Sequence, residues 1–212
     1  MSTENRPAWN KTVTVALTGA SGVHYGIRLI ECLVHSGNRV YVLVSKAARI
    51  VISTETGYQF PGQAAATESY LTDLFGAKPG QIKVFGREDW MAPVASGSGT
   101  ASTSMVVCPC SMGTLSAIAC GASDSLIERA ADVTLKERRQ LVLVPRETPL
   151  SEIHLENMLK LSRMGAVVLP ACPGFYHQPE SIQGLIDFVV ARILGHLGVE
   201  QKMVKEWGAD RQ

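Results

Sequence analysis

A short strand that runs directly into a glycine-rich turn and then into a helix constrains this chain more than any other feature. An alternating, β-branched run from Val13 leads into Thr18-Gly-Ala-Ser-Gly22, and a helix-compatible segment, Val23 to His35, follows at once. Glycines let the backbone approach an anion, and the helix N-terminus supplies free N–H groups and a positive dipole end. In α/β proteins this arrangement holds a phosphate. A plain tight turn is the alternative explanation for a motif of this length.

Length and composition fit one α/β domain with a full core. The chain has 212 residues, of which 46% are hydrophobic and 18% are charged. The net charge of +1 provides no polybasic surface, so we expect no nucleic-acid partner. We expect residues 1–11 to be a flexible N-terminus and residues 12–212 to form a single domain.

Cysteine usage and hydropathy indicate a cytoplasmic protein. The five cysteines are odd in number, and residues 1–10 lack the apolar core of a signal peptide, so reduced thiols are expected. No apolar run is long enough to span a membrane, so no membrane partner is expected.

Strand and helix patterns alternate along the whole chain. Strands are predicted at 12–18, 39–44, 81–85, 105–108, 140–144 and 166–169. Helices are predicted at 22–36, 46–56, 66–75, 111–121, 123–138, 151–164 and 180–197, with Ser151 as an N-cap. This order predicts a three-layer, Rossmann-like (flavodoxin-like) α/β fold, in which a parallel sheet carries helices on both faces.

Candidate functional residues come directly after the predicted strands. They are Ser21, Ser45-Lys46, Cys108 to Thr114, Arg146-Glu147 and Tyr176. In open α/β sheets the ligand binds at the carboxyl ends of the strands, so these groups are expected to converge on one cleft.

The first turn is a poor match to a dinucleotide site. Gly19, Gly22 and Gly26 are spaced one residue too long for the extended dehydrogenase fingerprint, and no acidic residue follows the second strand to bind a ribose. The chain also has no Tyr-x-x-x-Lys pair. Lys46 could still meet a 2′-phosphate, so NADP is disfavoured rather than excluded.

The segment Cys108-Pro-Cys-Ser-Met-Gly-Thr114 is more informative for its polar residues than for its thiols. C-x-C lacks zinc-ligand or redox spacing, and buried structural thiols are the favoured interpretation; no metal site is expected. Ser111, Gly113 and Thr114 open a helix after a strand and could hold an anion or a flavin. A simple N-cap by Ser111 explains the same pattern nearly as well.

Four further side chains have both a chemical and a structural interpretation. Arg146 suits a phosphate and Glu147 could move protons, but the two could equally form a surface ion pair. Arg192 lies among apolar residues and needs either an anion or a route to water. Trp90 could stack on an aromatic cofactor or stabilise a cation, although such a residue more often anchors its loop.

Ten motifs between about residues 13 and 207 carry a resemblance to a known family. They are Leu17-Thr-Gly-Ala-Ser-Gly22, Ser45-Lys-Ala-Ala48, Thr54-Glu-Thr56, Asp89-Trp-Met-Ala-Pro93, Cys108-Pro-Cys-Ser-Met-Gly-Thr114, Leu126-Ile-Glu-Arg-Ala-Ala-Asp-Val133, Leu135-Lys-Glu-Arg138, Leu143-Val-Pro-Arg-Glu-Thr-Pro149, His154-Leu-Glu-Asn-Met158 and Pro173-Gly-Phe-Tyr176. Together they resemble the flavin prenyltransferase family of UbiX type. Met112 stands where the family often has Thr, and the loop 97–104 differs in composition.

The resemblance implies a metal-independent transferase. Such enzymes join a dimethylallyl group from dimethylallyl monophosphate to N5 and then C6 of reduced FMN, and the prenylated FMN becomes the cofactor of UbiD-type decarboxylases. The resemblance also implies a homo-oligomer, a dodecamer, with sites where subunits meet. The sequence has no Asp-rich motif of the kind that marks diphosphate-using prenyltransferases.

The resemblance also implies a role for each matching residue. The residues that the resemblance implies in FMN binding are Gly19, Ala20, Ser21, Ser45, Ser111, Met112, Gly113, Thr114, Arg129 and Arg146. The residues that it implies in binding dimethylallyl phosphate are Lys136, Arg146, Tyr176 and Arg192. The catalytic residues are Glu147 as acid/base at the departing phosphate, Ser21 with Glu55 as a proton relay at N5, and Trp90 facing the allyl cation.

These implied roles are chemically coherent. Cationic donors on the leaving phosphate stabilise the charge that develops as the allylic bond breaks. A dry aromatic wall keeps water from the cation.

Two rival functions remain open. FMN-dependent cysteine-type decarboxylases share the fold family, but they need a catalytic histidine, and only His24 or His35 lies near the first helix. A non-catalytic FMN carrier is the second rival.

Overall fold

Six parallel strands form the central sheet, in the order β3-β2-β1-β4-β5-β6. The computed structural model describes residues 9–99 and 102–204. The strands are β1 (Thr12–Leu17), β2 (Arg39–Val44), β3 (Ile82–Phe85), β4 (Ser104–Cys110), β5 (Gln140–Pro145) and β6 (Val167–Val168). This strand order is that of the doubly wound Rossmann sheet.

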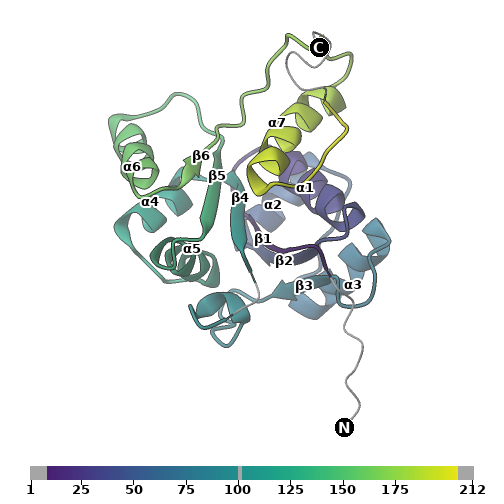
Figure 1. The fold of residues 1–212 in the computed structure, drawn as a ribbon, viewed down its shortest axis with the longest axis horizontal. Helices are drawn as coiled ribbons and strands as arrows, with labels where there is room; N and C mark the ends of the chain where they lie inside the picture. Colours follow the sequence, from purple (N-terminus) through teal and green to yellow (C-terminus); the bar gives the residue numbers. More distant parts are fainter. Residues whose placement is uncertain (1–8, 100–101, 205–212) are drawn as a thin grey trace.

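Helices cover both faces of the sheet (Figure 1). One face packs against α1 (Val23–His35), α2 (Lys46–Glu55), α3 (Ala64–Phe75) and α7 (Ile182–Leu197). The other packs against α4 (Met112–Cys120), α5 (Leu126–Lys136), α6 (Glu152–Arg163) and the short 3-10 helix η1 (Pro93–Ala95). The predicted three-layer, Rossmann-like fold is therefore confirmed.

The strands are apolar on both sides because both sides are covered. Val15 and Leu17 of β1 lie in the core under α1, whereas Ala16 lies in the core under α4 and α5, and all three are fully buried. A strand buried on two faces has a near-continuous apolar sequence, which is why the pattern predicted parallel strands.

Most predicted boundaries agree with the structure to within two residues, and the larger differences have local causes. The strand predicted to end at Cys108 continues to Cys110, because pairing with β5 resumes at Cys110 after a register irregularity. The helix predicted from residue 123 begins at Leu126, since Ser125 accepts a hydrogen bond from the Glu128 N–H as the N-cap. Ser151 is the N-cap of α6, as predicted.

The predicted domain boundaries stay predictions. Residues 1–8, 100–101 and 205–212 lie outside the described residues. Within the predicted N-terminal segment, Asn10 donates its backbone N–H to Gly37 O, and Lys11 donates to the carbonyls of Leu197 and Gly198. No helix among the described residues has the length and hydrophobicity needed to cross a membrane.

β1 and β4 lie side by side at the centre of the sheet, and their helices leave to opposite faces. The chain runs from β1 to α1 on one face and from β4 to α4 on the other, which is the topological switch point of such sheets. Ligands bind in the crevice that this divergence opens at the carboxyl ends of the strands.

Candidate active site

A buried threonine joins the turn after β1 to the start of α4. Thr18 is 1% exposed, and its hydroxyl donates to Pro109 O at 2.7 Å and accepts from the Ser111 N–H at 2.8 Å. Because the hydroxyl acts both as a donor and as an acceptor, it fixes the turn after β1 relative to the start of α4. The predicted turn at Ser21 and the predicted helix start at Ser111 therefore lie beside each other.

Three helices, α1, α2 and α4, begin at this edge of the sheet. The Ser45 hydroxyl accepts from Ala48 N–H at the start of α2, and the Ser111 hydroxyl accepts from Thr114 N–H at the start of α4. The N-cap interpretation of Ser111 is thus confirmed, and it leaves the other free N–H groups of α4 available to an anion.

Glu55 caps α1 from the end of α2. Its Oε2 accepts from the N–H of Gly22 at 2.8 Å and of Val23 at 3.4 Å. Partial burial favours the protonated form, but hydrogen bonds from the Ser21 side chain and from these two N–H groups outweigh it, so the pKa of Glu55 lies below its usual value. The structure thus brings Ser21 and Glu55 together, with the carboxylate as hydrogen-bond acceptor.

The end of β5 meets the same turn. Arg146 Nε donates to Ser21 O at 3.2 Å, across 125 residues of sequence. Glu147 is exposed, and its Oε1 accepts from Thr148 N–H. Among the described residues neither side chain forms an ion pair, so the surface ion pair considered from the sequence is not formed.

A pocket of about 140 Å³ lies beside this cluster, at the ends of β2 and β3. Its polar lining includes the hydroxyls of Ser45 and Thr114 and the cations Lys46 and Arg87. The remaining lining residues are Leu43, Val44, Phe85, Gly86, Ser125, Leu126, Ile127 and Glu128. Sequence reasoning missed Arg87, although it follows a strand as the other candidates do.

The residues present fit a flavin mononucleotide. Hydroxyls, helix N-termini and two cations form a donor set that suits a phosphate. A Cβ on Gly113 would meet nothing within 4 Å, so the backbone at the start of α4 is open to a ligand. The pocket is smaller than a cavity for a whole FMN, so it has room for only part of this group.

Three of the predicted FMN residues can act only through their backbones or their packing. The Met112 side chain is 7% exposed and packs in the core under α4. Ala20 is also buried. A Cβ on Gly19 would lie 2.4 Å from Ala47 Cβ, so this glycine is required for the turn to approach α2.

The thiols near the site are buried and shielded. Cys108 and Cys110 are fully buried, and burial raises the pKa of Cys108 strongly and that of Cys110 to about 12. A thiol that ionises so reluctantly is a poor nucleophile, which supports the structural interpretation. Within residues 9–99 and 102–204, no three His, Cys, Asp or Glu side chains gather as a metal site would require.

Known proteins resemble this chain over nearly its whole length. The model of the family described as Flavoprotein matches residues 1–194. The flavin prenyltransferase UbiX of Pseudomonas aeruginosa is 62% identical over 196 residues, which cover 92% of this chain and 93% of the relative. The chain belongs to the UbiX family of flavin prenyltransferases.

Two solved structures share the fold closely. The structure of AnUbiX (PadA1) in complex with FMN and dimethylallyl pyrophosphate has a TM-score of 0.83 and 43% identity, covering 93% of this chain and 97% of that one. A dodecameric FMN-dependent UbiX-like decarboxylase from Escherichia coli O157:H7 has a TM-score of 0.81 and 41% identity, covering 92% and 98%.

In this UbiX-family chain, the predicted site residues form two groups according to where the structure places them. The residues at the ends of β1, β2, β4 and β5 lie together, as described above. Tyr176, 57% exposed, lies on the turn after β6, and Arg192 is exposed on α7. Arg192 therefore has its route to water, and its apolar neighbours in sequence point into the core instead.

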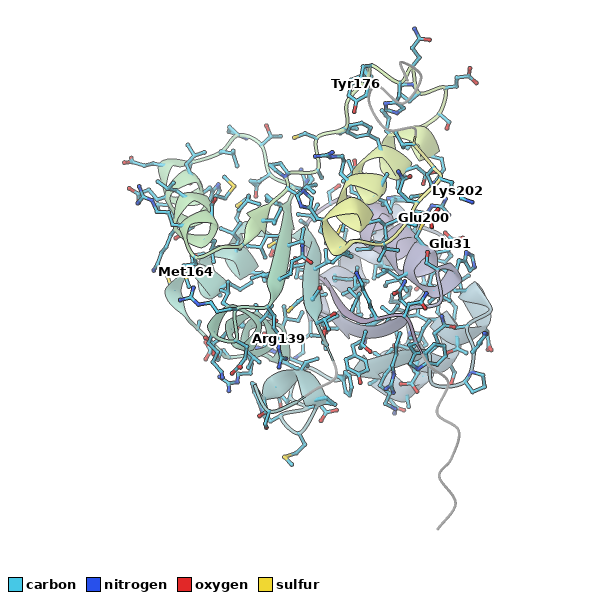
Figure 2. The ribbon with its side chains drawn as sticks, in the orientation of Figure 1. Glu31, Arg139, Met164, Tyr176, Glu200 and Lys202 are labelled. Atoms are coloured by element: carbon cyan, nitrogen blue, oxygen red, sulfur yellow. The ribbon has the colours of Figure 1, made fainter. Side chains whose placement is uncertain are left out.

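The second group consists of Arg129, Lys136 and Trp90. Arg129 donates to Ala95 O and pairs with Asp132, and Lys136 pairs with Glu137 in the last turn of α5. Figure 2 places Arg139, just beyond that turn, at the opposite end of the molecule from Tyr176. Trp90 is 47% exposed on the loop that leads to η1. One chain does not assemble Lys136 with Tyr176.

Proposed function

We propose that this member of the UbiX family transfers the dimethylallyl group of dimethylallyl monophosphate to N5 and C6 of reduced FMN. The prenylated FMN then serves a UbiD-type decarboxylase. The observation that carries the proposal is the meeting of Ser21, Glu55 and Arg146 beside a pocket whose hydroxyls and cations suit a phosphate. A cytoplasmic location stays a prediction.

The residues at the ends of β1, β2, β4 and β5 have separate roles at the flavin. Reduced FMN, when bound, supplies the nucleophilic N5 and C6 atoms. Ser45, Thr114 and the start of α4 would hold its phosphate end, and Arg146 would contact both the flavin and the prenyl donor. Ser21 holds a proton near N5, and Glu55 accepts it because the carboxylate is ionised and hydrogen-bonded to the Ser21 side chain.

The prenyl donor requires more than one subunit. Tyr176, Arg192 and Arg146 hold the phosphate, and Glu147 is the acid/base at the departing phosphate. Lys136 and Trp90 come from a neighbouring copy, since Arg139, just beyond Lys136, lies at the opposite end of the molecule from Tyr176 (Figure 2). The AnUbiX complex with dimethylallyl pyrophosphate and the dodecameric E. coli neighbour support a prenyl-phosphate site within a homo-oligomer.

Direct product analysis tests this function. The protein is incubated without oxygen with reduced FMN and dimethylallyl monophosphate, and the flavin is examined by mass spectrometry. We expect a flavin enlarged by one C5 unit. Dimethylallyl pyrophosphate is the matched comparison and should react more slowly. An unmodified flavin with both donors would exclude the proposal.

Decarboxylation is the second candidate because the E. coli neighbour is described as an FMN-dependent decarboxylase. His24 is exposed on the first turn of α1 near Glu55, whereas His35 lies at the other end of that helix. Only His24 could therefore serve such a reaction. Release of CO2 from a peptidyl or pantothenoyl cysteine, without any prenyl donor, would favour this alternative.

A further inference from the structure

An aromatic cluster holds the turn that carries Tyr176. Phe175 O accepts from the Gln178 N–H at 2.9 Å, so Tyr176 and His177 are the two central residues of a turn. The His177 ring stacks on Phe188 of α7, with 4.9 Å between centroids and 9° between planes. Tyr176 meets both rings edge-on, at 5.8 Å and 5.5 Å.

His177 makes no use of its nitrogens in this cluster. Both Nδ1 and Nε2 are buried, and neither has a hydrogen-bond partner among the described residues. Buried polar atoms without partners are rare and call for an explanation. The contacts that the ring does make are aromatic, since it stacks on Phe188 and meets Tyr176 edge-on.

The cluster lies next to Arg192, one of the residues predicted to bind the phosphate of the prenyl donor. Phe188 and Arg192 are four residues apart on α7 and so share one face of that helix. A Cβ on Gly174 would lie 3.0 Å from Tyr176 Cε1 and 3.1 Å from Phe188 Cζ, so the turn packs closely on this face. The position of the turn on α7 therefore sets where Tyr176 lies relative to Arg192.

We propose that His177 is a positioning residue for the prenyl donor. Its ring docks the turn on Phe188 and thereby holds Tyr176 beside the α7 face that carries Arg192. This inference rests on the proposed function, in which Tyr176 and Arg192 bind the phosphate of dimethylallyl monophosphate. His177 itself touches neither substrate nor flavin in this role.

Three substitutions separate the aromatic role from a hydrogen-bonding role. For His177→Ala we expect the KM for dimethylallyl monophosphate to rise about three- to tenfold, as the loss of one aromatic pair implies, with kcat and FMN affinity little changed. His177→Phe should restore the wild-type KM, and His177→Gln should not. Gly174→Ala, which pushes the rings apart, should raise KM as His177→Ala does. Glu180→Gln, exposed on the same loop, is the matched control.

Amide hydrogen exchange at Gln178 tests the docking without any catalysis. Exchange should accelerate in His177→Ala and remain slow in His177→Phe, with urea unfolding used to verify that each variant is folded. The inference is overturned if His177→Phe behaves like His177→Ala, if His177→Gln retains a normal KM, or if His177→Ala changes neither KM nor exchange. If the wild type adds no C5 unit to FMN, the proposed function fails, while the exchange result still decides whether His177 docks the turn.

Discussion

At the residue scale, Glu55 performs two tasks with one carboxylate. It caps α1 through Gly22 and Val23, and it accepts a hydrogen bond from Ser21 at the edge where the flavin is expected. Both tasks need the ionised form. Stability and proton relay should therefore depend on pH through the same group.

Replacing Glu55 by Gln should lower stability in a pH-dependent way. The folded-state pKa of Glu55 is lowered, so its contribution is fully present above the unfolded carboxyl pKa and disappears as the pH falls through the folded value. At neutral pH the loss of this cap should cost about 1 kcal/mol. Urea unfolding from about pH 7 to about pH 3 measures the difference, which should vanish at the acid end. Glu200→Gln, at an exposed position, is the control, and an equal effect there would refute the assignment.

Glu147 is the residue on which catalysis should depend most directly. Its side chain is exposed and its neighbour Arg146 contacts the Ser21 turn, so Gln at this position should preserve the structure. We expect Glu147→Gln to reduce prenylation about a hundredfold or more, the usual loss for a general acid. FMN titration followed by absorbance should show unchanged binding. Undiminished product formation would remove Glu147 from the mechanism, and FMN binding by a wild-type protein that forms no prenylated product would favour a carrier.

At the element scale, the approach of α1 to the sheet depends on a single glycine. A Cβ on Gly26 would lie 2.2 Å from Cys108 O and 2.3 Å from Leu17 Cδ2. Both of these atoms belong to buried strands whose ends form the site. A larger residue here would move α1, and with it the Ser21 turn.

Gly26→Ala should therefore destabilise the protein despite the higher helix propensity of alanine. We expect a loss of about 1–3 kcal/mol, as is typical of overpacking, and weaker FMN binding. Gly195→Ala in α7 is the matched control, since a Cβ there would meet nothing within 4 Å. That variant should gain up to about 1 kcal/mol. Equal effects of the two substitutions in urea unfolding would contradict the packing argument.

At the scale of the whole molecule, exposed apolar side chains favour self-association. Large hydrophobic side chains on α6, notably Ile153, Leu155 and Leu159, are more than half exposed. Met91, beside Trp90, is 94% exposed. Patches of this kind mark interaction surfaces in soluble proteins. They agree with a site that one chain leaves incomplete.

Subunit mixing tests whether the site is shared. Lys136→Ala and Tyr176→Phe should each remove most prenylation, because each weakens binding of the phosphate of the prenyl donor. When equal amounts of the two variants are coexpressed, about a quarter of the sites in a random homo-oligomer would combine the intact Lys136 and Tyr176 of different copies. Recovered activity at that level supports the shared site. No recovery, with mixed oligomers verified by mass, would place both residues in one subunit.

Short-range patterns in the sequence were enough to predict the elements and the fold class. Periodicity of two or of 3.6 residues, capping residues and the alternation of strand and helix depend on neighbours within a few positions. The same patterns placed Ser21, Ser45, Ser111 and Arg146 after strands, and the carboxyl-end rule then predicted that they converge. Lys136 came from the family motifs alone.

The tertiary structure decided what depends on residues far apart in sequence. Glu55 meets Gly22 across 33 residues, and Arg146 meets Ser21 across 125. It also placed Arg139, just beyond Lys136, at the opposite end of the molecule from Tyr176, and it stacked His177 on Phe188. No local pattern encodes such contacts, because they arise only when the sheet order brings distant strand ends together. The sequence by itself determined the strand, glycine turn and helix, while the folded chain determined which side chains that turn would face.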